Sequence, residues 1–401
     1  MKTFPRIITI ALVLGISACA TPINHADMLV LDSHLDTPLV LDRAGFDIQK
    51  RHDWMNDYAQ LDLPRMREGG LDGGFWVIYT AQGPLTADGY AKALTHARQR
   101  NNVIDRLVKQ HANDFALALR AEDAHRLKTI GKRVVYKSIE NAYPLGTNID
   151  LLDEFYAAGV RMVGLVHSRN NQFADSATDK RGQVWGGLSP LGRQLIKRAN
   201  ELGMIVDMSH AHDDALAQAI EVSVTPVILS HSGVGTLYKH PRNVPNSLLQ
   251  KLAKSGGVIQ INSLSGYLRD LNTDPNRLPE FLAIYKKYQN APGGMRLNSQ
   301  AFIAERRALD KKYPPDYAEF SDVMDHIFAA LELMGPDHVG IGLDWDGGGG
   351  VNGLQDVANL PKITHALQNK GLDTATIEQI WSGNMLRLLA QAEAMKDKWA
   401  R

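Results

Sequence analysis

Acidic and histidine residues close six apolar, β-rich runs in this 401-residue sequence. In chain order these residues are Asp36, Glu140, His167, His210, His231 and Asp344. Imidazole nitrogens and carboxylate oxygens bind catalytic zinc, which keeps one position open for water. Because a purely structural role does not require titratable residues at so many run ends, the pattern predicts a metal-dependent hydrolytic site.

The predicted metal ligands come from four of these runs. His34 and Asp36 are two residues apart, so both side chains point to one face of a strand. The carboxylate of Glu140 can bridge two metal ions about 3.5–4 Å apart. His210 and His231 each follow a serine at the end of an apolar run. We therefore predict these five residues as the ligands of a two-metal site.

Taken alone, each ligand has a structural alternative. A His-x-Asp pair can be incidental, a glutamate can cap a helix or form a salt bridge, and a single histidine can be a hydrogen-bonded core residue. Asp32 shares the face of His34 and is interpreted as a buried polar partner, while His212 is placed in the following loop. The metal site is favoured because the residues recur at the same level of successive runs.

The runs alternate with helical stretches, which predicts parallel strands joined by helical crossovers. The candidate strands span residues 28–36, 73–80, 133–140, 160–167, 204–210, 226–231, 257–263 and 338–344. The candidate helices include residues 150–158, 190–202, 213–221, 244–255, 320–334 and 374–395. Eight such strands close a (β/α)8 TIM barrel, whose active sites lie at the carboxyl ends of the strands. The sequence thus predicts an α/β fold in which one barrel of the metal-dependent hydrolase type spans residues 28–401.

Residues 264–319 interrupt this alternation between the seventh and eighth candidate strands. The segment is charged, contains prolines and is longer than an ordinary connection. It is interpreted as an insertion over the mouth of the barrel, either a lid or an oligomer contact, and a surface excursion without catalytic consequence is the alternative.

The composition is that of a globular protein, with 44% hydrophobic and 22% charged residues. Lysine plus arginine equals aspartate plus glutamate at 44 each, so there is no basic excess to bind nucleic acid. The single cysteine, Cys19, excludes a disulfide framework and a thiolate-rich structural zinc site in the body of the chain.

The first residues are typical of an export signal. A short basic region precedes an apolar run from Ile7 to Ile16 that is too short to span a bilayer. Residues 1–18 are predicted to be a signal peptide with a lipobox, Cys19 the lipidated residue, and residues 19–27 a tether. Ala20 after the cysteine favours the outer membrane facing the periplasm. The alternative is a chance cysteine beside an ordinary signal peptide.

The whole pattern resembles the membrane dipeptidase (renal dipeptidase) family, metallopeptidases of the amidohydrolase type, over nearly the whole mature chain. The matching motifs are residues 32–36, 74–76, 138–140, 165–170, 188–192, 206–210, 228–232, 242–245 and 342–347.

The resemblance implies two zinc ions per chain, one held by His34, Asp36 and Glu140 and the other by Glu140, His210 and His231. A hydroxide bridging the metal ions would be the nucleophile.

Three further roles follow from the resemblance. It implies that His167 faces the scissile carbonyl, that Arg242 receives the substrate carboxylate, and that Asp344 contacts the substrate amine and relays a proton. Arginine presents a planar fork that matches a carboxylate, whereas a carboxylate at the mouth can hold an ammonium. Both ends of a dipeptide would then be recognised, which disfavours longer peptides.

The sequence departs from the family pattern beside the bridging glutamate. Ser138 and Asn141 stand where family members commonly have glycine, and the family's substrate-contacting tyrosine is not matched to Tyr267 with certainty. Substrate preference therefore stays open, including tolerance of a C-terminal D-residue and β-lactam opening. A homodimer is a separate open alternative for the oligomeric state.

Three hypotheses follow. The first is a zinc dipeptidase of the cell envelope. The second is a related periplasmic hydrolase or tailoring enzyme that acts on a non-dipeptide amide, lactone or siderophore-like substrate. The third, a binding module without activity, is disfavoured because all five ligands are present together with Arg242 and Asp344.

The lipid anchor predicts that Cys19→Ser releases the protein from membranes, because the sequence has no other cysteine to which a lipid could be attached. Membrane and soluble fractions of expressing cells, probed for the full chain, measure the change. A variant that still fractionates entirely with membranes contradicts the anchor.

Overall fold

The computed structural model describes residues 24–289 and 299–399, so the predicted signal peptide and Cys19 lie outside the described residues. Within these ranges one sheet contains ten strands, and every pairing in it is parallel. Its main path runs in chain order through β1 (Leu31–Leu35), β2 (Gly73–Tyr79), β4 (Arg133–Glu140), β5 (Val160–Gly164), β6 (Ile205–Asp207), β7 (Ile228–Val234), β9 (Val258–Ile261) and β10 (Val339–Ile341). Two short strands pair at its side, β3 (Phe115–Leu117) with β4 and β8 (Asn243–Val244) with β7. The eight predicted strands and the (β/α)8 barrel are confirmed.

A buried carboxylate joins the first and last strands of the barrel. Asp32 Oδ1 accepts a hydrogen bond from the backbone N–H of His34 at 2.9 Å, and its Oδ2 accepts one from Leu343 at 3.1 Å. Asp36 N–H donates to the carbonyl of Trp345 at 2.9 Å. Burial raises the pKa of Asp32 to about 7. These contacts close the barrel between β1 and β10, and they hold the backbone of His34 and Asp36 in place.

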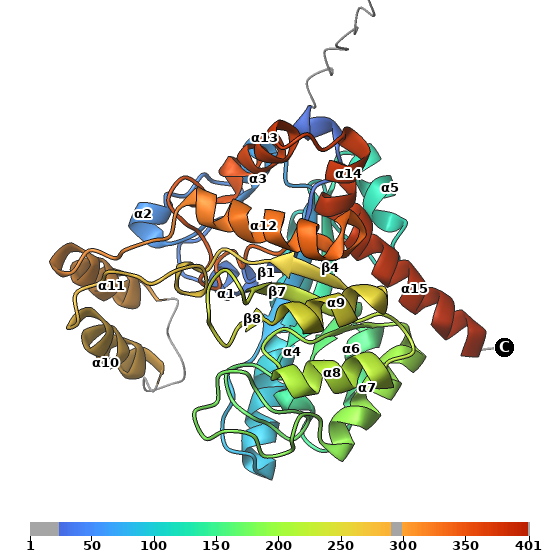
Figure 1. The fold of residues 1–401 in the computed structure, drawn as a ribbon. Coiled ribbons are helices and arrows are strands. Elements are labelled where there is room, and N and C mark those ends of the chain that lie inside the picture. The colour runs from blue at the N-terminus through green and yellow to red at the C-terminus, as the bar shows by residue number, and fades with distance from the viewer. Residues whose placement is uncertain (1–23, 290–298, 400–401) are drawn as a thin grey trace, which may run out of the picture.

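Fifteen α-helices of the described residues cover the outside of the barrel, except for α10 and α11, which project from it (Figure 1). They are α1 (Pro38–Leu41), α2 (Trp54–Asp57), α3 (Leu63–Glu68), α4 (Ala87–Gln110), α5 (Asp123–Thr129), α6 (Leu151–Ala157), α7 (Pro190–Leu202), α8 (Asp213–Val222), α9 (Asn246–Lys254), α10 (Arg277–Gln289), α11 (Gln300–Lys312), α12 (Phe320–Met334), α13 (Pro361–Asn369), α14 (Thr374–Glu378) and α15 (Asn384–Trp399). The predicted helices 190–202 and 320–334 match α7 and α12. The predicted helix 374–395 is divided, because a π-helical turn at Gln379–Gly383 separates α14 from α15.

Local sequence explains the limits of α7. Ser189 precedes the helix, and its hydroxyl accepts a hydrogen bond from Gly192 N–H, while Pro190 occupies the first turn. Gly203 ends the helix in a left-handed conformation, with φ of 74°. Leu195, Ile196 and their neighbours on one face are buried against the barrel.

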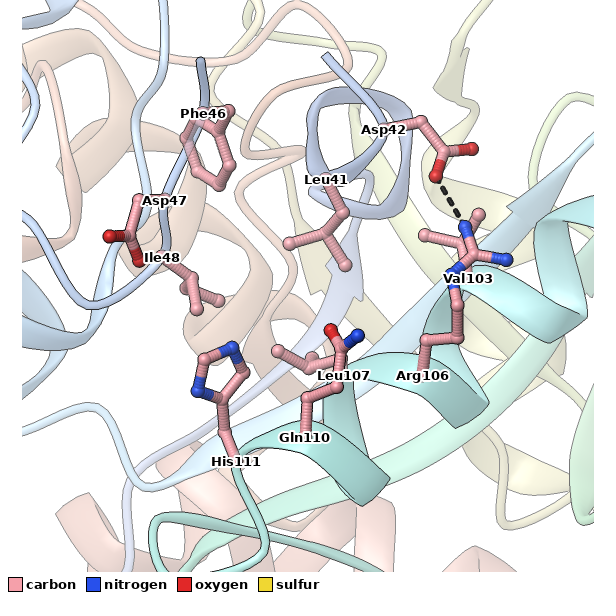
Figure 2. Close-up of a pocket in the computed structure, with 10 residues that line it drawn as sticks. All are labelled: Leu41, Asp42, Phe46, Asp47, Ile48, Val103, Arg106, Leu107, Gln110 and His111. Carbon is pink, nitrogen blue, oxygen red and sulfur yellow. Dashed lines mark hydrogen bonds and ion pairs between the residues drawn. The ribbon is translucent and has the colours of Figure 1, made fainter. Parts of the chain in front are cut away.

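A small pocket lies on the outside of the barrel between the α1 region and α4 (Figure 2). Its volume is about 150 Å³. Arg106 in its lining donates to Asp42 at 2.6 Å, so the one arginine that lines this pocket is already paired.

The predicted insertion between the seventh and eighth barrel strands lies between β9 and β10 and contains α10 and α11. The two helices project from one side of the barrel (Figure 1). The Tyr58 hydroxyl donates to Asp310 of α11 at 2.5 Å, and the Arg306 guanidinium carbon lies 3.8 Å from the centre of the Tyr58 ring. Arg277 of α10 donates to the same Asp310 at 2.7 Å. The insertion is therefore tied to the loop that follows α2.

Folded contacts begin before the predicted domain start at Met28. His25 is buried, its Nδ1 lies 2.6 Å from the Thr364 hydroxyl, and its Nε2 lies 2.9 Å from the Gly69 carbonyl oxygen. The last residues of the predicted 19–27 tether thus pack against the barrel.

Among the described residues, we find no helix with the length and apolar character needed to cross a bilayer.

Candidate metal centre

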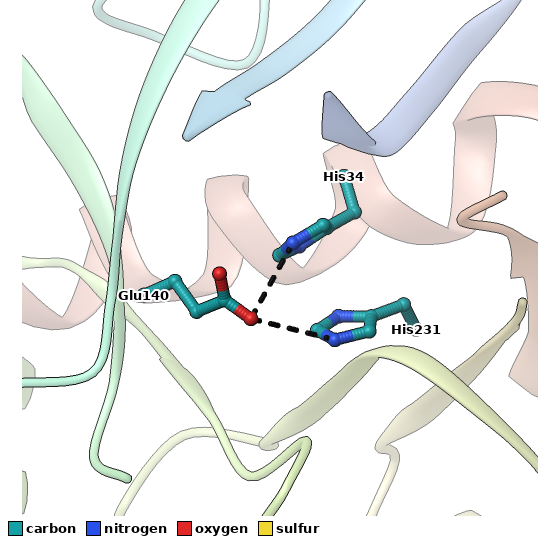
Figure 3. Close-up of side chains that lie close together, drawn as sticks. All are labelled: His34, Glu140 and His231. Carbon is teal, nitrogen blue, oxygen red and sulfur yellow. Dashed lines mark ion pairs between the residues drawn. The ribbon is translucent and has the colours of Figure 1, made fainter. Parts of the chain in front are cut away.

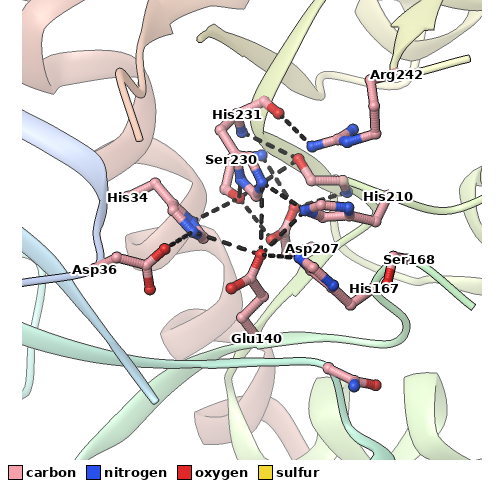
Figure 4. A network of polar contacts seen from close by, with 12 residues as sticks. His34, Asp36, Glu140, His167, Ser168, Asp207, His210, Ser230, His231 and Arg242 are labelled. Atoms are coloured by element: carbon pink, nitrogen blue, oxygen red, sulfur yellow. Dashed lines mark hydrogen bonds and ion pairs between the residues drawn. The ribbon is translucent and has the colours of Figure 1, made fainter. Parts of the chain in front are cut away.

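The predicted metal-ligand and substrate-contacting residues converge at the carboxyl end of the barrel. Figure 4 labels all of them except Asp344. Asp36 directly follows β1, Glu140 is the last residue of β4, and His231 lies within β7. His210 and Asp344 each lie three residues after a strand, β6 and β10 respectively. Parallel strands bring their carboxyl ends to the same rim, so residues far apart in sequence become neighbours.

One oxygen of Glu140 is the centre of this cluster. Its Oε1 lies 3.0 Å from His210 Nε2, 3.6 Å from both His34 Nε2 and His231 Nε2, and 3.7 Å from His167 Nε2. Figure 3 shows His34 and His231 approaching that oxygen from the same side of the carboxylate. Glu140 and three of the four histidines are buried, while the side chain of His167 is 25% exposed. His167 therefore lies on the open side of the cluster.

The donor set fits metal ions. His34 Nε2 and Asp36 Oδ1 are buried and have no hydrogen-bond partner, although buried polar atoms are normally paired. The Nε2 atoms of His210 and His231 lie 2.8 Å apart, so two imidazoles aim at one point.

Three overlapping groups of described residues bring their ligand atoms within 4.8 Å of one another. They are His34 with Glu140 and His231, Glu140 with His167 and His210, and His34 with Asp36 and Asp344. The structure thus brings all five predicted ligands together, with Glu140 shared by two groups. His167 and Asp344, predicted to contact substrate, lie close enough to complete two of them.

Burial and neighbouring charges shift the pKa values of the site's three carboxylates. Burial raises the pKa of Asp344 well above its ordinary value, and the charges of Asp36 and Glu140 add to this shift. Burial, followed by the charge of Glu140, also raises the pKa of Asp36. Burial acts in the same direction on Glu140, but the His34 and His167 charges outweigh it and hold its pKa well below the ordinary value. Three carboxylates in one buried cluster favour a bound cation.

Burial holds the pKa of His210 and of His231 well below the ordinary value, and the charge of Arg242 adds to the shift. Both imidazoles are therefore neutral, which is the form that binds metal ions. Burial also lowers the pKa of His167.

A second layer of hydrogen bonds orients His231. The Ser230 hydroxyl donates to Asp207 Oδ2 at 2.6 Å and lies 2.8 Å from His231 Nδ1. Since the hydroxyl has only one hydrogen, His231 Nδ1–H donates to it, which leaves Nε2 free to bind a metal. Asp207 Oδ1 in turn accepts from the N–H groups of Ser209 and Ser230 at 2.9 and 3.0 Å.

Unusual backbone conformations aim two of the side chains. His210 and Asp344 have φ of 68° and 64°, a left-handed region that costs a non-glycine residue free energy. A Cβ on Gly347 would lie 2.1 Å from Asp36 Oδ2 and 2.2 Å from Asp344 Oδ1. Glycine at 347 therefore makes room for two acidic side chains.

Arg242 lies buried beside the cluster, just before β8. Its Nη2 donates to the His231 carbonyl at 2.8 Å, whereas its buried Nε has no hydrogen-bond partner. The ring centre of Tyr267 lies 5.5 Å from the guanidinium carbon. This tyrosine, which the sequence left unmatched, thus lies against the predicted carboxylate-binding arginine.

Several residues around the site were not singled out from sequence. Tyr79, at the end of β2, has its ring centre 4.9 Å from that of His167. Asp207 and Ser230 are polar residues inside buried strands. Asp207 lies three residues before His210, and Ser230 directly precedes His231. That polarity is the signal that could have identified the latter two. His212 caps α8 and accepts from Asp214 N–H at 3.2 Å, as its predicted loop position implies.

Comparison with known proteins agrees with this geometry. The sequence model of the membrane dipeptidase family, peptidase family M19, matches residues 21–401. Dipeptidase tcpJ of Claviceps purpurea is 30% identical over 371 residues, which cover 90% of this chain and 76% of that protein.

Two solved structures share the fold. The probable dipeptidase PvdM of Pseudomonas aeruginosa has a TM-score of 0.78 at 30% identity, covering 92% of this chain and 97% of that one. A metallopeptidase of Rhodobacter sphaeroides, solved with a phosphinate mimic of the dipeptide L-Ala-D-Ala, has a TM-score of 0.71 at 23% identity. In that match, 90% of this chain and 99% of the other are covered.

The central position of Glu140 predicts that Glu140→Gln weakens metal binding with little change in fold. Removing the shared charge should lower metal affinity by at least about 10–100-fold, the loss typical of changes in the outer shell alone. Metal content after dialysis, with circular dichroism for folding, measures the effect. Glu154→Gln is the control, because Glu154 pairs with Arg98 on the surface at 2.7 Å. Equal metal content in the two variants would show that Glu140 is not a ligand.

Proposed function

This chain belongs to the membrane dipeptidase family and is a metal-dependent dipeptidase, and we propose that it binds two zinc ions at the Glu140 centre. The observation that carries the proposal is the position of Glu140 Oε1, within 3.0–3.7 Å of four imidazole nitrogens. We assign one ion to His34, Asp36 and Glu140, and the other to Glu140, His210 and His231. Zinc bound there would polarise the scissile carbonyl and activate a bridging hydroxide as nucleophile.

The residues around the ions would hold the substrate. His167 is the most exposed of the histidines around Glu140, so it can reach the scissile carbonyl and stabilise the charge that develops on its oxygen. Arg242 would bind the free carboxylate of a dipeptide, and its unpartnered Nε supports this role. Asp344 would hold the substrate amine and relay a proton. Asp344 is buried, and its ligand atom lies within 4.8 Å of those of His34 and Asp36, so a group held by Asp344 would lie beside the metal centre.

Export and lipid attachment at Cys19 belong to the same proposal and rest on the sequence alone. An anchored enzyme facing the periplasm would encounter short peptides in the cell envelope. Acceptance of a C-terminal D-residue rests on the family resemblance, whereas a homodimeric state rests on the interpretation of the insertion as an oligomer contact.

A hydrolysis panel tests the proposed substrate class. We expect zinc-loaded protein to cleave L,L-dipeptides and L,D-dipeptides, and to cleave tripeptides at least about tenfold more slowly, because both charged ends of a dipeptide are bound. Lactones and amides that lack a free carboxylate are the comparison set. Faster turnover of a lactone than of every dipeptide would favour the tailoring-enzyme alternative.

The role of Arg242 predicts a selective defect in Arg242→Ala. Loss of a charge-assisted hydrogen bond should raise KM by about 10–100-fold for a dipeptide with a free carboxylate. The KM of the corresponding dipeptide amide should change little. The ratio of kcat/KM for the two substrates therefore measures the effect within one protein sample. An equal fall in kcat/KM for both substrates would instead mean that Arg242 acts by holding the His231 carbonyl in place.

A further inference from the structure

A second, larger pocket opens beside the metal centre. Its volume of about 470 Å³ lies within the range of small-molecule sites, about 300–1,000 Å³. The loop after β5 and α10 of the insertion line it together with the end of β2 and the loop that follows. The residues that bear on its chemistry are Tyr79, Gln82, Ser168, Arg169, Tyr285 and Lys286. Because the ring of Tyr79 also contacts His167, the pocket adjoins the place proposed for the scissile bond.

The pocket is positively charged. Arg169 and Lys286 both line it, and no acidic residue does so in the described parts of the chain. Both side chains are exposed, and within residues 24–289 and 299–399 neither has an ion-pair or hydrogen-bond partner. The small outer pocket differs, because its Arg106 is paired with Asp42 at 2.6 Å (Figure 2). The larger pocket thus offers two cations to a ligand.

Other groups in the pocket suit a peptide. Gln82 Nε2 donates to the Asn170 carbonyl at 2.8 Å, which fixes the amide, and its buried Oε1 has no hydrogen-bond partner. That oxygen can accept an N–H of the substrate. The rings of Tyr79 and Tyr285 can pack against methylene groups.

We propose that this pocket selects dipeptides with an acidic side chain, whose carboxylate Arg169 and Lys286 bind. The inference rests on the proposed function, since the peptide bond must lie at the Glu140 centre. Arg242 is buried on a different segment, before β8, and would bind the C-terminal carboxylate. Arg169 and Lys286 therefore remain for a second anionic group. Charge-assisted hydrogen bonds from arginine and lysine to a carboxylate supply the selectivity.

Matched dipeptides test the preference. Glu-Ala and Gln-Ala, and likewise Ala-Glu and Ala-Gln, have nearly the same shape and differ in charge. In the pair whose side chain faces the pocket, we expect kcat/KM about tenfold higher for the glutamate peptide, chiefly through KM. Ratios near one in both pairs, or a preference for the uncharged peptide, overturn the inference.

Variants assign the preference to the two cations. In the double variant Arg169→Gln, Lys286→Gln the glutamate-to-glutamine ratio should fall to near one. The charge-conserving variant Arg169→Lys, Lys286→Arg should retain most of it. The control is Arg106→Gln, which removes a positive charge from the small pocket between the α1 region and α4 and should keep the wild-type ratio. A double variant with the wild-type ratio overturns the assignment, and the ratio is independent of how much protein folds.

Failure of the proposed function has a different signature. If no dipeptide is cleaved, the proposed activity is wrong, and the pocket is tested by calorimetric titration of the metal-loaded protein. The probes are phosphinate analogues of the four dipeptides, which bind without turnover. About tenfold tighter binding of a glutamate analogue than of its glutamine counterpart supports the inference, and equal binding within both pairs overturns it.

Discussion

The buried carboxylate of Glu140 is the constraint on which this site depends. A carboxylate excluded from water is costly unless cations or hydrogen-bond donors surround it. Here His34, His167, His210 and His231 place a ring nitrogen within 3.0–3.7 Å of one of its oxygens. The nearly closed barrel of parallel strands makes this possible, because it brings residues separated by up to 197 positions around one point.

The surrounding structure holds these groups in a high-energy arrangement. His210 and Asp344 have left-handed backbone conformations, and Gly347 leaves room for acidic side chains that repel one another. The Asp207–Ser230–His231 hydrogen bonds fix one imidazole in the form that binds metal. Asp32 meanwhile joins β10 to the strand that carries His34. The contacts of the barrel thus hold the acidic and histidine side chains close together, in an arrangement that suits a bound metal ion.

The surface around the centre divides into a buried and an exposed cationic part. Arg242 lies inside, against the His231 carbonyl and the Tyr267 ring, where it can recognise a group that enters fully. Arg169 and Lys286 lie outside, between the β5 loop and the insertion. Lys286 lies on α10, which is held to the barrel through Asp310 and Tyr58, so the insertion supplies one of these two cations and the β5 loop supplies the other.

The sequence by itself determined the eight strands and the barrel, because buried parallel strands are continuous apolar runs, and it predicted five ligands at the strand ends that the structure brings together. It also located the insertion between the strands now labelled β9 and β10. The tertiary structure decided which side chains meet. Tyr79 and Tyr267 became part of the site because they lie beside His167 and Arg242 in space, although no local pattern marks them. Likewise, only the folded chain joins Gln82, Arg169 and Lys286 in one pocket, since their proximity depends on how distant segments pack and not on any spacing along the chain.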